Sequence, residues 1–241
     1  MKALIKRLRD SLFNSSIAVS QMDRLEELLK SQAFCVAVAN TNWIKNKVFY
    51  PGRWAADYSL LLTLYRALEE IRPANILEFG LGETSKLIHQ YADFEKGVNA
   101  ITIEHDNEWI NSFKDRMRIE YKMEIVVCEL EEVTVDGFVS KSYKSIREKL
   151  GSIKYDLIII DGPFGSDRFS RPSILYIADK NIADDFCIIF DDMVRKGEQD
   201  TFFKLVELFQ KNGKNVHVAI HPGVKRHGVI CSDKFKFMVT I

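Results

Sequence analysis

A chain of 241 residues is long enough for one large domain, and 46% hydrophobic and 28% charged residues are ordinary proportions for a globular protein. Lys and Arg together number 34, as do Asp and Glu, so the net charge is zero. We therefore expect no nucleic-acid partner held by overall charge, although a local basic patch remains open. The four cysteines form no CxxC or Cys/His pattern, which indicates reduced thiols and a cytoplasmic protein.

Residues 1–16 mix apolar positions with Lys and Arg, so they contain no continuous apolar block of the kind found in a signal sequence. No stretch of the sequence is long and apolar enough to cross a bilayer, and we expect no integral membrane segment. A basic helix at this position would have either a solvated face or a face that touches a membrane surface.

The sequence before the first apolar block predicts helices. A capping-box pattern at residues 20–23 would start one helix, and the apolar spacing of residues 57–71 predicts another that ends before Pro73. We therefore expect a helical N-terminal extension over residues 1–72, followed by the main domain over residues 73–241. The extension would cover the functional site or contact a second copy of the chain in a homodimer.

From residue 73 onward, apolar blocks of strand length alternate with segments of helical periodicity. The blocks are continuous runs of Ile, Val and Leu, which are typical of strands buried on both faces of a parallel sheet. This predicts an α/β protein with a Rossmann-like, doubly wound, mostly parallel seven-stranded sheet. Residues 215–241 leave no room for a helix and predict a C-terminal antiparallel hairpin. The expected strands are NILEF, AITIEH, EIVVC, YDLIIID and FCIIFDD, and the expected helices are NEWINSFKDRMRIEY, KSYKSIREKL and DTFFKLVELFQKN.

An acidic residue follows or ends each of the five expected parallel strands. In open α/β sheets, ligands bind outside the carboxyl ends of the strands, so these carboxylates would lie together on one rim. Mutual repulsion makes such a cluster costly unless cations or hydrogen-bond donors meet it. Helix capping explains one or two of these acids but explains all five less easily. They are Glu78, Glu104, Glu129, Asp161 and the pair Asp191-Asp192.

The loop after the first strand, in the stretch NILEFGLGETS, contains the glycines Gly80 and Gly82. Glycines allow a tight turn and a close approach of the backbone to a ligand, although GxG alone also fits a simple turn. A dinucleotide fingerprint has a third glycine, where this chain has Ser85. Glu78 at the mouth of the loop would repel a pyrophosphate, so the loop favours a ligand with ammonium, sulfonium and ribose groups.

The series LEFGLGETS, ITIEHD, VVCEL, YDLIIIDGPFG and CIIFDDM resembles the class I S-adenosylmethionine-dependent methyltransferases, over about residues 55–241. The resemblance implies that Glu78, Gly80 and Gly82 lie against the methionine and ribose parts of S-adenosylmethionine. It implies that Glu104 accepts hydrogen bonds from the ribose hydroxyls.

The same resemblance implies roles for further residues around the cofactor. His105 would border the adenosine site, Glu129 would lie near the adenine amino group, and Asp161 would lie by the methyl group. Thr84 and Ser85 would donate hydroxyl hydrogen bonds to the cofactor carboxylate, with helix capping as the alternative. The family also places the segment before the first strand over the cofactor, which singles out Trp54.

The stretch from Ile160 to Met193 is similar to a subgroup that methylates hydroxyl groups of sugars and other small molecules. The absence of an Asn-Pro-Pro-Tyr motif argues against methylation of amino groups. Residues 164–168 could form a lid over the substrate. The expected acceptor is therefore a small molecule, a sugar or a polysaccharide hydroxyl.

Two hypotheses remain open for the acids after the fourth and fifth strands. Some O-methyltransferases of this fold hold a divalent cation there, and Asp161, Asp191 and Asp192 would suit Mg²⁺, Mn²⁺ or Ca²⁺. Asp192 stands where those enzymes have an amide, so the match is partial. The alternative is a metal-free site in which Asp161 and Asp192 are catalytic, with Asp192 as proton acceptor.

Three other functions share the strand–loop–helix pattern. A nicotinamide-dependent oxidoreductase would bind NAD in preference to S-adenosylmethionine. An aminopropyltransferase would use the same fold with a decarboxylated cofactor. A non-catalytic nucleoside-binding protein would keep the glycine loop without turnover.

Overall fold

The computed structural model describes residues 21–22, 24–52, 55–117 and 121–240. The expectations for the basic segment 1–16, for the capping-box residues Ser20 and Asp23 and for Trp54 lie outside these residues. Within the described ranges, no helix is long and apolar enough to cross a membrane.

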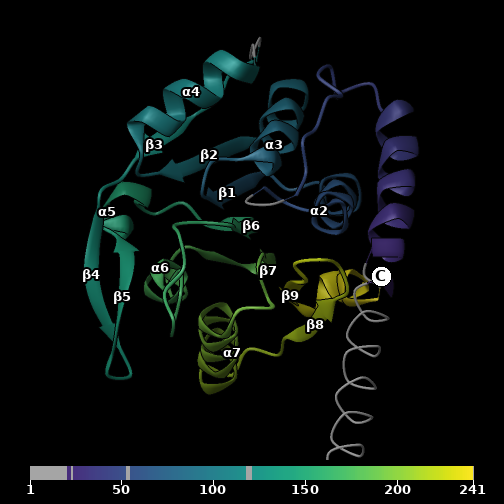
Figure 1. Ribbon diagram of the computed structural model, residues 1–241. Coiled ribbons are helices and arrows are strands. Elements are labelled where there is room, and N and C mark those ends of the chain that lie inside the picture. The colour runs from purple at the N-terminus through teal and green to yellow at the C-terminus, as the bar shows by residue number, and fades with distance from the viewer. Residues whose placement is uncertain (1–20, 23, 53–54, 118–120, 241) are drawn as a thin grey trace, which may run out of the picture.

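A seven-stranded sheet forms the centre of the molecule, with strand order β3-β2-β1-β6-β7-β9-β8 (Figure 1). The first five strands of this order are parallel, and β9 runs antiparallel to both β7 and β8. The doubly wound sheet and its C-terminal antiparallel hairpin are thus confirmed. The strands are β1 (Asn75–Phe79), β2 (Asn99–Glu104), β3 (Ile125–Val127), β6 (Tyr155–Ile160), β7 (Ile182–Phe190), β8 (His217–His221) and β9 (His227–Cys231).

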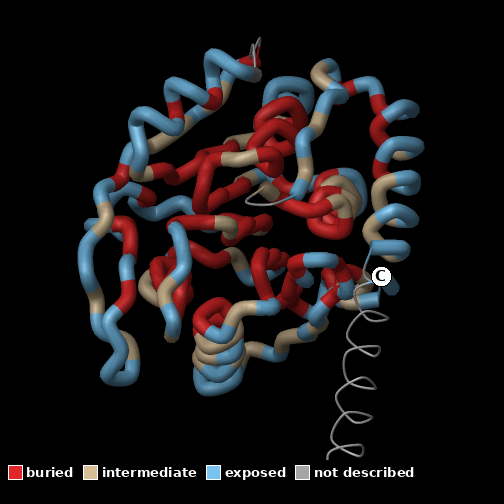
Figure 2. Tube along the Cα trace, viewed as in Figure 1, coloured by how far each residue is buried: buried red, intermediate tan, exposed pale blue. Residues whose placement is uncertain are grey.

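Continuous apolar runs place side chains in two separate cores, one on each face of the sheet. In β6, Leu157 and Ile159 belong to one core, whereas Ile158 and Ile160 belong to the other. Figure 2 shows the central strands as buried and the outer helices as exposed on their solvent sides. The sheet is therefore the middle of three layers.

Helices cover both faces and fix the strand ends. On one face lie α2 (Tyr58–Ile71) and α3 (Glu83–Phe94), and on the other lie α5 (Ile146–Leu150), α6 (Ser173–Ile177) and α7 (Lys196–Lys211). α4 (Asn107–Met117) packs through Ile110 and Phe113 against Leu81 of the glycine loop. α2 begins at the N-cap Asp57, whose Oδ1 accepts from Leu60 N at 2.9 Å.

The expected helix over KSYKSIREKL is wrong in its first half. β4 (Leu130–Val135) and β5 (Phe138–Tyr143) form a separate antiparallel ribbon, and only the short α5 is helical. Asp136 and Gly137 both have positive φ, at 48° and 85°, as a two-residue hairpin turn of the primed type requires. The Asp-Gly pair was therefore a hairpin signal in the sequence.

The chain end also differs from the expected strand. Asp233–Val239, η1, consists of short 3₁₀ turns with a kink at Phe235, and both Phe235 and Met238 enter the core. The expectation that this region leaves no room for a helix is wrong.

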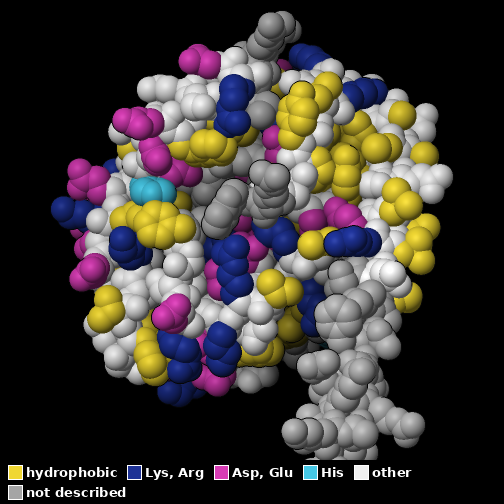
Figure 3. All heavy atoms as spheres, viewed as in Figure 1, with side chains coloured by type: hydrophobic (Ala, Val, Ile, Leu, Met, Phe, Trp, Pro, Cys, Tyr) yellow, Lys and Arg dark blue, Asp and Glu magenta, His cyan; other side chains and the backbone are white. Residues whose placement is uncertain are grey.

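The N-terminal helix, over residues 24–39, contributes Phe34 and Val38 to the core that contains α2 and α3. Its other apolar residues, Leu25, Leu28 and Leu29, are exposed, and Figure 3 shows hydrophobic side chains along this outer helix at the right. The boundary near residue 72 and the homodimer stay predictions.

Candidate active site

The glycine loop connects β1 to α3 and touches the end of β6. Gly80 has φ +95°, and a Cβ there would lie 2.7 Å from the carbonyl oxygen of Asp161. Only glycine fits this position without moving the backbone. Gly82 has extended backbone, with φ −166°, and a Cβ there would meet nothing within 4 Å. The space in front of Gly82 is therefore open.

Glu78 is fully buried behind the loop. Its carboxylate accepts hydrogen bonds from the hydroxyls of Thr84 (2.6 Å), Ser85 (2.6 Å) and Thr102 (2.7 Å). Burial raises the pKa of Glu78 to about 7, against these three hydrogen bonds, which lower it.

These hydrogen bonds join the end of β1 to β2 and to the first turn of α3, on either side of the glycine loop. Ser85 Oγ also accepts from Gly82 N at 2.9 Å, as the helix-capping alternative requires. Glu78, Thr84 and Ser85 thus hold the shape of the loop, and direct contact of their side chains with a cofactor stays a prediction.

Glu104 ends β2, and its carboxylate is held by backbone amides. Oε2 accepts from Leu81 N at 3.0 Å, and Oε1 accepts from His105 N at 2.6 Å and Asp106 N at 3.0 Å. The residue is 5% exposed, and the His105 ring lies beside it, with Nδ1 2.6 Å from Oε1. The carboxylate is therefore held in one place next to the glycine loop.

A cavity of about 550 Å³ opens in front of this loop. Trp109 closes one side, and its Nε1 donates to Leu81 O at 2.8 Å. The segment before α2 closes another side, as the resemblance implied. The lining residues are Tyr50, Gly52, Ala55, Leu81, Gly82, Glu83, Trp109, Phe113, Arg116 and Asp161.

A buried ion pair that the sequence reasoning missed fixes this segment. Lys86 Nζ lies 2.9 Å from Glu83 Oε2 and also donates to Val48 O, while Tyr50 N donates to the same Glu83 oxygen at 2.9 Å. The i, i+3 spacing of Glu83 and Lys86 was the available signal, but it usually marks an exposed pair.

Glu129 lies apart from the other strand-end acids. Its side chain is 82% exposed, 3.8 Å from Lys144 Nζ, and it does not line the cavity at the glycine loop. Its expected contact with adenine stays a prediction.

Asp161 follows β6 and also lines a second cavity, of about 680 Å³. The expected lid residues, including Phe164 and Asp167, form part of its wall. The lining residues are Asp161, Phe164, Gly165, Ser166, Asp167, Arg171, Asp192, Arg195, Lys196 and Gly197. Asp161 thus lies where the two cavities meet.

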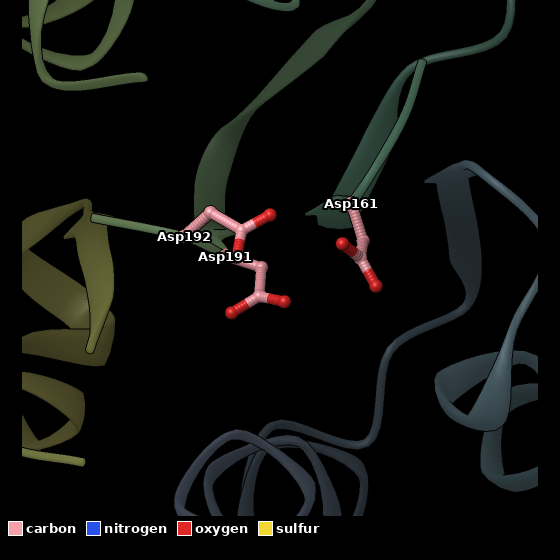
Figure 4. Close-up of side chains that lie close together, drawn as sticks. All are labelled: Asp161, Asp191 and Asp192. Atoms are coloured by element: carbon pink, nitrogen blue, oxygen red, sulfur yellow. The ribbon is translucent and has the colours of Figure 1, made fainter. Parts of the chain in front are cut away.

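Asp161, Asp191 and Asp192 come from the ends of two neighbouring strands, and Figure 4 shows their side chains pointing toward one common space. One oxygen of each lies within 4.8 Å of the others. The sequence therefore predicted this gathering of carboxylates correctly.

Two buried cations that the sequence reasoning missed pair with these acids. Arg171 Nη2 donates to Asp192 Oδ2 at 2.6 Å and lies 3.5 Å from Asp161 Oδ1. Lys225 Nζ donates to Asp191 Oδ2 at 2.5 Å and lies 3.2 Å from Asp192 Oδ1. Neither cation belongs to a local motif, because each reaches the acids from a distant loop.

The three acids differ in the direction of their pKa shifts, and the pKa of Lys225 is shifted as well. Burial, and next the charge of Asp191, raise the pKa of Asp161 well above its ordinary value. Burial also raises the pKa of Asp191. Burial alone would raise the pKa of Asp192, but Arg171 and Lys225 bring it below its ordinary value. Burial alone would lower the pKa of Lys225, but Asp191 and Asp161 raise it. The anionic form of Asp192 is therefore stabilised by its cationic partners, whereas burial favours the protonated form of Asp161.

No protein-family model and no curated protein sequence matches the chain. Among solved structures, it is similar to the S-adenosylhomocysteine-bound methyltransferase PaMTH1 of Podospora anserina, with a TM-score of 0.53, 13% identity and coverage of 86% of this chain and 96% of that one. It is also similar to a Staphylococcus aureus protein assigned as a caffeoyl-CoA O-methyltransferase, with a TM-score of 0.53, 15% identity and coverage of 85% and 99%.

The sheet order and these similarities define the class of fold. The chain has the Rossmann-like fold of the class I S-adenosylmethionine-dependent methyltransferases.

Proposed function

We propose that the protein is an S-adenosylmethionine-dependent methyltransferase that methylates a hydroxyl oxygen of a small molecule or a sugar. The observation that carries this proposal is the position of Asp161 on the walls of both cavities. A methyl donor in the cavity at the glycine loop and an acceptor in the second cavity would meet at this carboxylate. Proximity of the two reactants is the main contribution of the protein to such a transfer.

The cavity at the glycine loop fits the cofactor. The open space beyond Gly82 leaves room for a ligand against the backbone. Glu104 does not line this cavity, but backbone amides hold its carboxylate beside Leu81 of the lining, and we propose that it also accepts from the ribose hydroxyls. Tyr50, Trp109 and Phe113 supply apolar and aromatic surface, as small-molecule sites usually do. S-adenosylmethionine, when bound, supplies a methyl group on a positively charged sulfur.

Asp161 is the proton acceptor in this proposal. Its carboxylate takes the proton of the acceptor hydroxyl, which makes the acceptor oxygen a better nucleophile toward the methyl carbon. A raised pKa favours this role, because a base whose pKa is nearer the working pH holds the proton more effectively. Asp192 is a weaker candidate, since Arg171 and Arg195 lie 2.6 and 3.1 Å from its Oδ2.

The second cavity favours a polar acceptor. Carboxylates, guanidinium groups and Ser166 surround it, so hydroxyl groups would find both donors and acceptors there. Phe164 is 55% exposed and offers one apolar face, on which a sugar ring or an aromatic ring could lie. This combination supports a polyhydroxyl or phenolic acceptor. A soluble cytoplasmic setting and a homodimer are parts of the proposal that rest on the sequence.

The order of the sheet argues against the nicotinamide alternative. Dinucleotide-binding sheets have the order 3-2-1-4-5-6 with all strands parallel. Here the last strand, β9, lies antiparallel between β7 and β8. Aminopropyl transfer and non-catalytic nucleoside binding remain the alternatives to be tested.

A transfer assay tests the proposal. The protein is incubated with S-adenosylmethionine carrying a labelled methyl group and with separate pools of sugars, polyols, phenols and amines. A parallel incubation uses decarboxylated S-adenosylmethionine as the donor. We expect label in a hydroxyl-containing product, and product formation about 10²–10⁴-fold slower when Asp161 is replaced by Asn. Label that appears only in amine acceptors, or an aminopropyl product from decarboxylated S-adenosylmethionine alone, would overturn the proposal.

A further inference from the structure

The three acids beside the acceptor cavity are arranged closely enough for a hard divalent cation. Each of Asp161, Asp191 and Asp192 offers one carboxylate oxygen within 4.8 Å of the others. Carboxylate oxygens are the ligands that Mg²⁺, Mn²⁺ and Ca²⁺ prefer. Whether these residues fit an ion depends on what else lies among the oxygens.

Lys225 already pairs with two of these three acids, Asp191 and Asp192, while Asp161 pairs with Arg171. Lys225 Nζ has three oxygen neighbours, namely Asp191 Oδ2 at 2.5 Å, Asp192 Oδ1 at 3.2 Å and Ala55 O at 3.2 Å. The ammonium donates hydrogen bonds to Asp191 Oδ2 and Ala55 O and forms an ion pair with Asp192, so its charge and two of its three N–H donors are already engaged. A divalent ion would bind the same carboxylates at about 2.0–2.6 Å, where it would collide with the ammonium and be repelled by it.

Lys225 is held in place by two elements far apart in the sequence. Its backbone N donates at 3.1 Å to Asp57 Oδ2, and Asp57 is also the N-cap of α2. Next to it, Ser59 Oγ donates to Pro222 O at 2.7 Å. Lys225 is 8% exposed, so its ammonium belongs to the interior and is not a mobile surface group.

Arg171 fixes a second positive charge on the other side of the acids. Nη1 donates to Ile160 O at 3.2 Å and Asp191 O at 3.3 Å, and Nη2 donates to Asp192 Oδ2 at 2.6 Å. The side chain is 4% exposed. Arg195 lies 3.1 Å from Asp192, and Glu198 lies 3.8 Å from Arg171 and 3.7 Å from Arg195. The acids of this site therefore already have three fixed cationic partners, each of which would repel a divalent ion.

We propose that the ammonium of Lys225 is the resident cation of this site and takes the place that a divalent metal ion would have among Asp161, Asp191 and Asp192. Methyl transfer by this chain then requires no metal. Removal of the ammonium should convert the three acids into a metal site, because Asp191 Oδ2 is released and, among the described residues, nothing bonds Asp191 Oδ1. The statement about methyl transfer rests on the proposed function, whereas the statement about metal binding does not.

Calorimetric titration with Mn²⁺ tests the proposal on chelator-treated protein. Wild type should show no stoichiometric Mn²⁺ binding, whereas Lys225→Met should bind one Mn²⁺ per chain, and Lys225→Met/Asp191→Asn should lose it. Lys234→Met is the matched control, since Lys234 is paired at 3.0 Å with Asp185 on the surface at the opposite end of β7. It should behave as wild type.

Binding of Mn²⁺ by wild type that Asp191→Asn abolishes would overturn the proposal. A folded Lys225→Met protein that binds no Mn²⁺ would overturn the claim that removal of the ammonium creates a metal site. If Lys225→Met does not fold, Lys225→Gln replaces it in the titration. In either case, the titration of wild type decides whether the native site binds a divalent ion. Once an acceptor is known, wild-type turnover should be unchanged after exhaustive chelation. Failure of S-adenosylmethionine to bind would remove the proposed function but leave the Mn²⁺ result standing.

Discussion

The backbone of Gly80 lies directly against the backbone of Asp161: a Cβ on Gly80 would be 2.7 Å from the Asp161 carbonyl oxygen. The contact fixes the glycine loop relative to the carboxylate that we propose as proton acceptor. Gly80→Ala would force both a left-handed non-glycine residue and a clash with backbone. We expect a loss of about 1–3 kcal/mol in the free energy of unfolding, measured in urea. An unchanged free energy of unfolding would mean that the two strand ends are not in contact.

Gly82→Val separates ligand binding from folding. Its backbone is extended, which any residue adopts, and a side chain would enter open space in front of the loop. We expect an unfolding midpoint close to that of wild type and loss of S-adenosylhomocysteine binding in calorimetry. Retained binding would show that the ligand does not approach Gly82.

Glu104→Gln should weaken cofactor binding by roughly 1–3 kcal/mol, the scale of a hydrogen bond to a charged group. The same carboxylate accepts hydrogen bonds from three backbone N–H groups. We therefore also expect a measurable loss in the free energy of unfolding, which substitution of a surface acid without such partners would not cause. Binding and unfolding are therefore measured on the same sample. Cofactor affinity equal to that of wild type would remove Glu104 from the site.

The sequence predicted the parallel sheet and the rim of carboxylates because both depend on short-range patterns. NILEF and YDLIIID are each buried on two faces, so their composition is nearly sufficient to identify them. Once the strand order follows, Asp161, Asp191 and Asp192 come together at the ends of neighbouring strands, whereas Glu129 stays exposed and apart. The β4–β5 ribbon was missed because the helical pattern of charges at Lys144–Lys149 was extended backward over residues 141–143 of β5, and the Asp136-Gly137 turn signal before them was not used.

The cations of the site could not be predicted in the same way. Lys225 reaches Asp191 from the β8–β9 loop, and Arg171 reaches Asp192 with φ +57° in an irregular segment. Neither position follows from periodicity, because each depends on how distant loops pack. The sequence therefore left the metal question open, and it is the contacts of Lys225 that argue for a site without metal.

The raised pKa of Asp161 predicts the acid limb of the pH–rate profile. The proton acceptor must be deprotonated, so kcat/KM should fall as the pH drops through a pKa well above 3.8. Asp161→Asn should lower kcat by about 10²–10⁴-fold and remove this limb. The control Asp184→Asn, at an exposed position of β7, should retain the wild-type kcat and the acid limb of the pH–rate profile. A limb that persists in Asp161→Asn would assign the proton to another group.

Glu78 should make the stability of the protein depend on pH. Its pKa is about 7 in the folded protein and 4.5 ordinarily, so the folded state binds the proton more tightly. The stabilisation by this proton is complete below pH 4.5 and is lost as the pH rises through 7, with a total of about 3 kcal/mol.

Urea unfolding of wild type and Glu78→Gln at pH 5 and pH 8 measures this effect. Gln is neutral at both values, so wild type should lose stability relative to the variant as the pH rises. A difference between the two proteins that is the same at both pH values would contradict the assignment.

Binding of the methyl donor is the central claim, and calorimetric titration of wild type with S-adenosylmethionine, with NAD as the competing ligand, tests it most directly. We expect one S-adenosylmethionine per chain, no measurable NAD binding, and loss of the S-adenosylmethionine signal in Gly82→Val. Binding of NAD alone, or of neither ligand by a folded protein, would contradict the account.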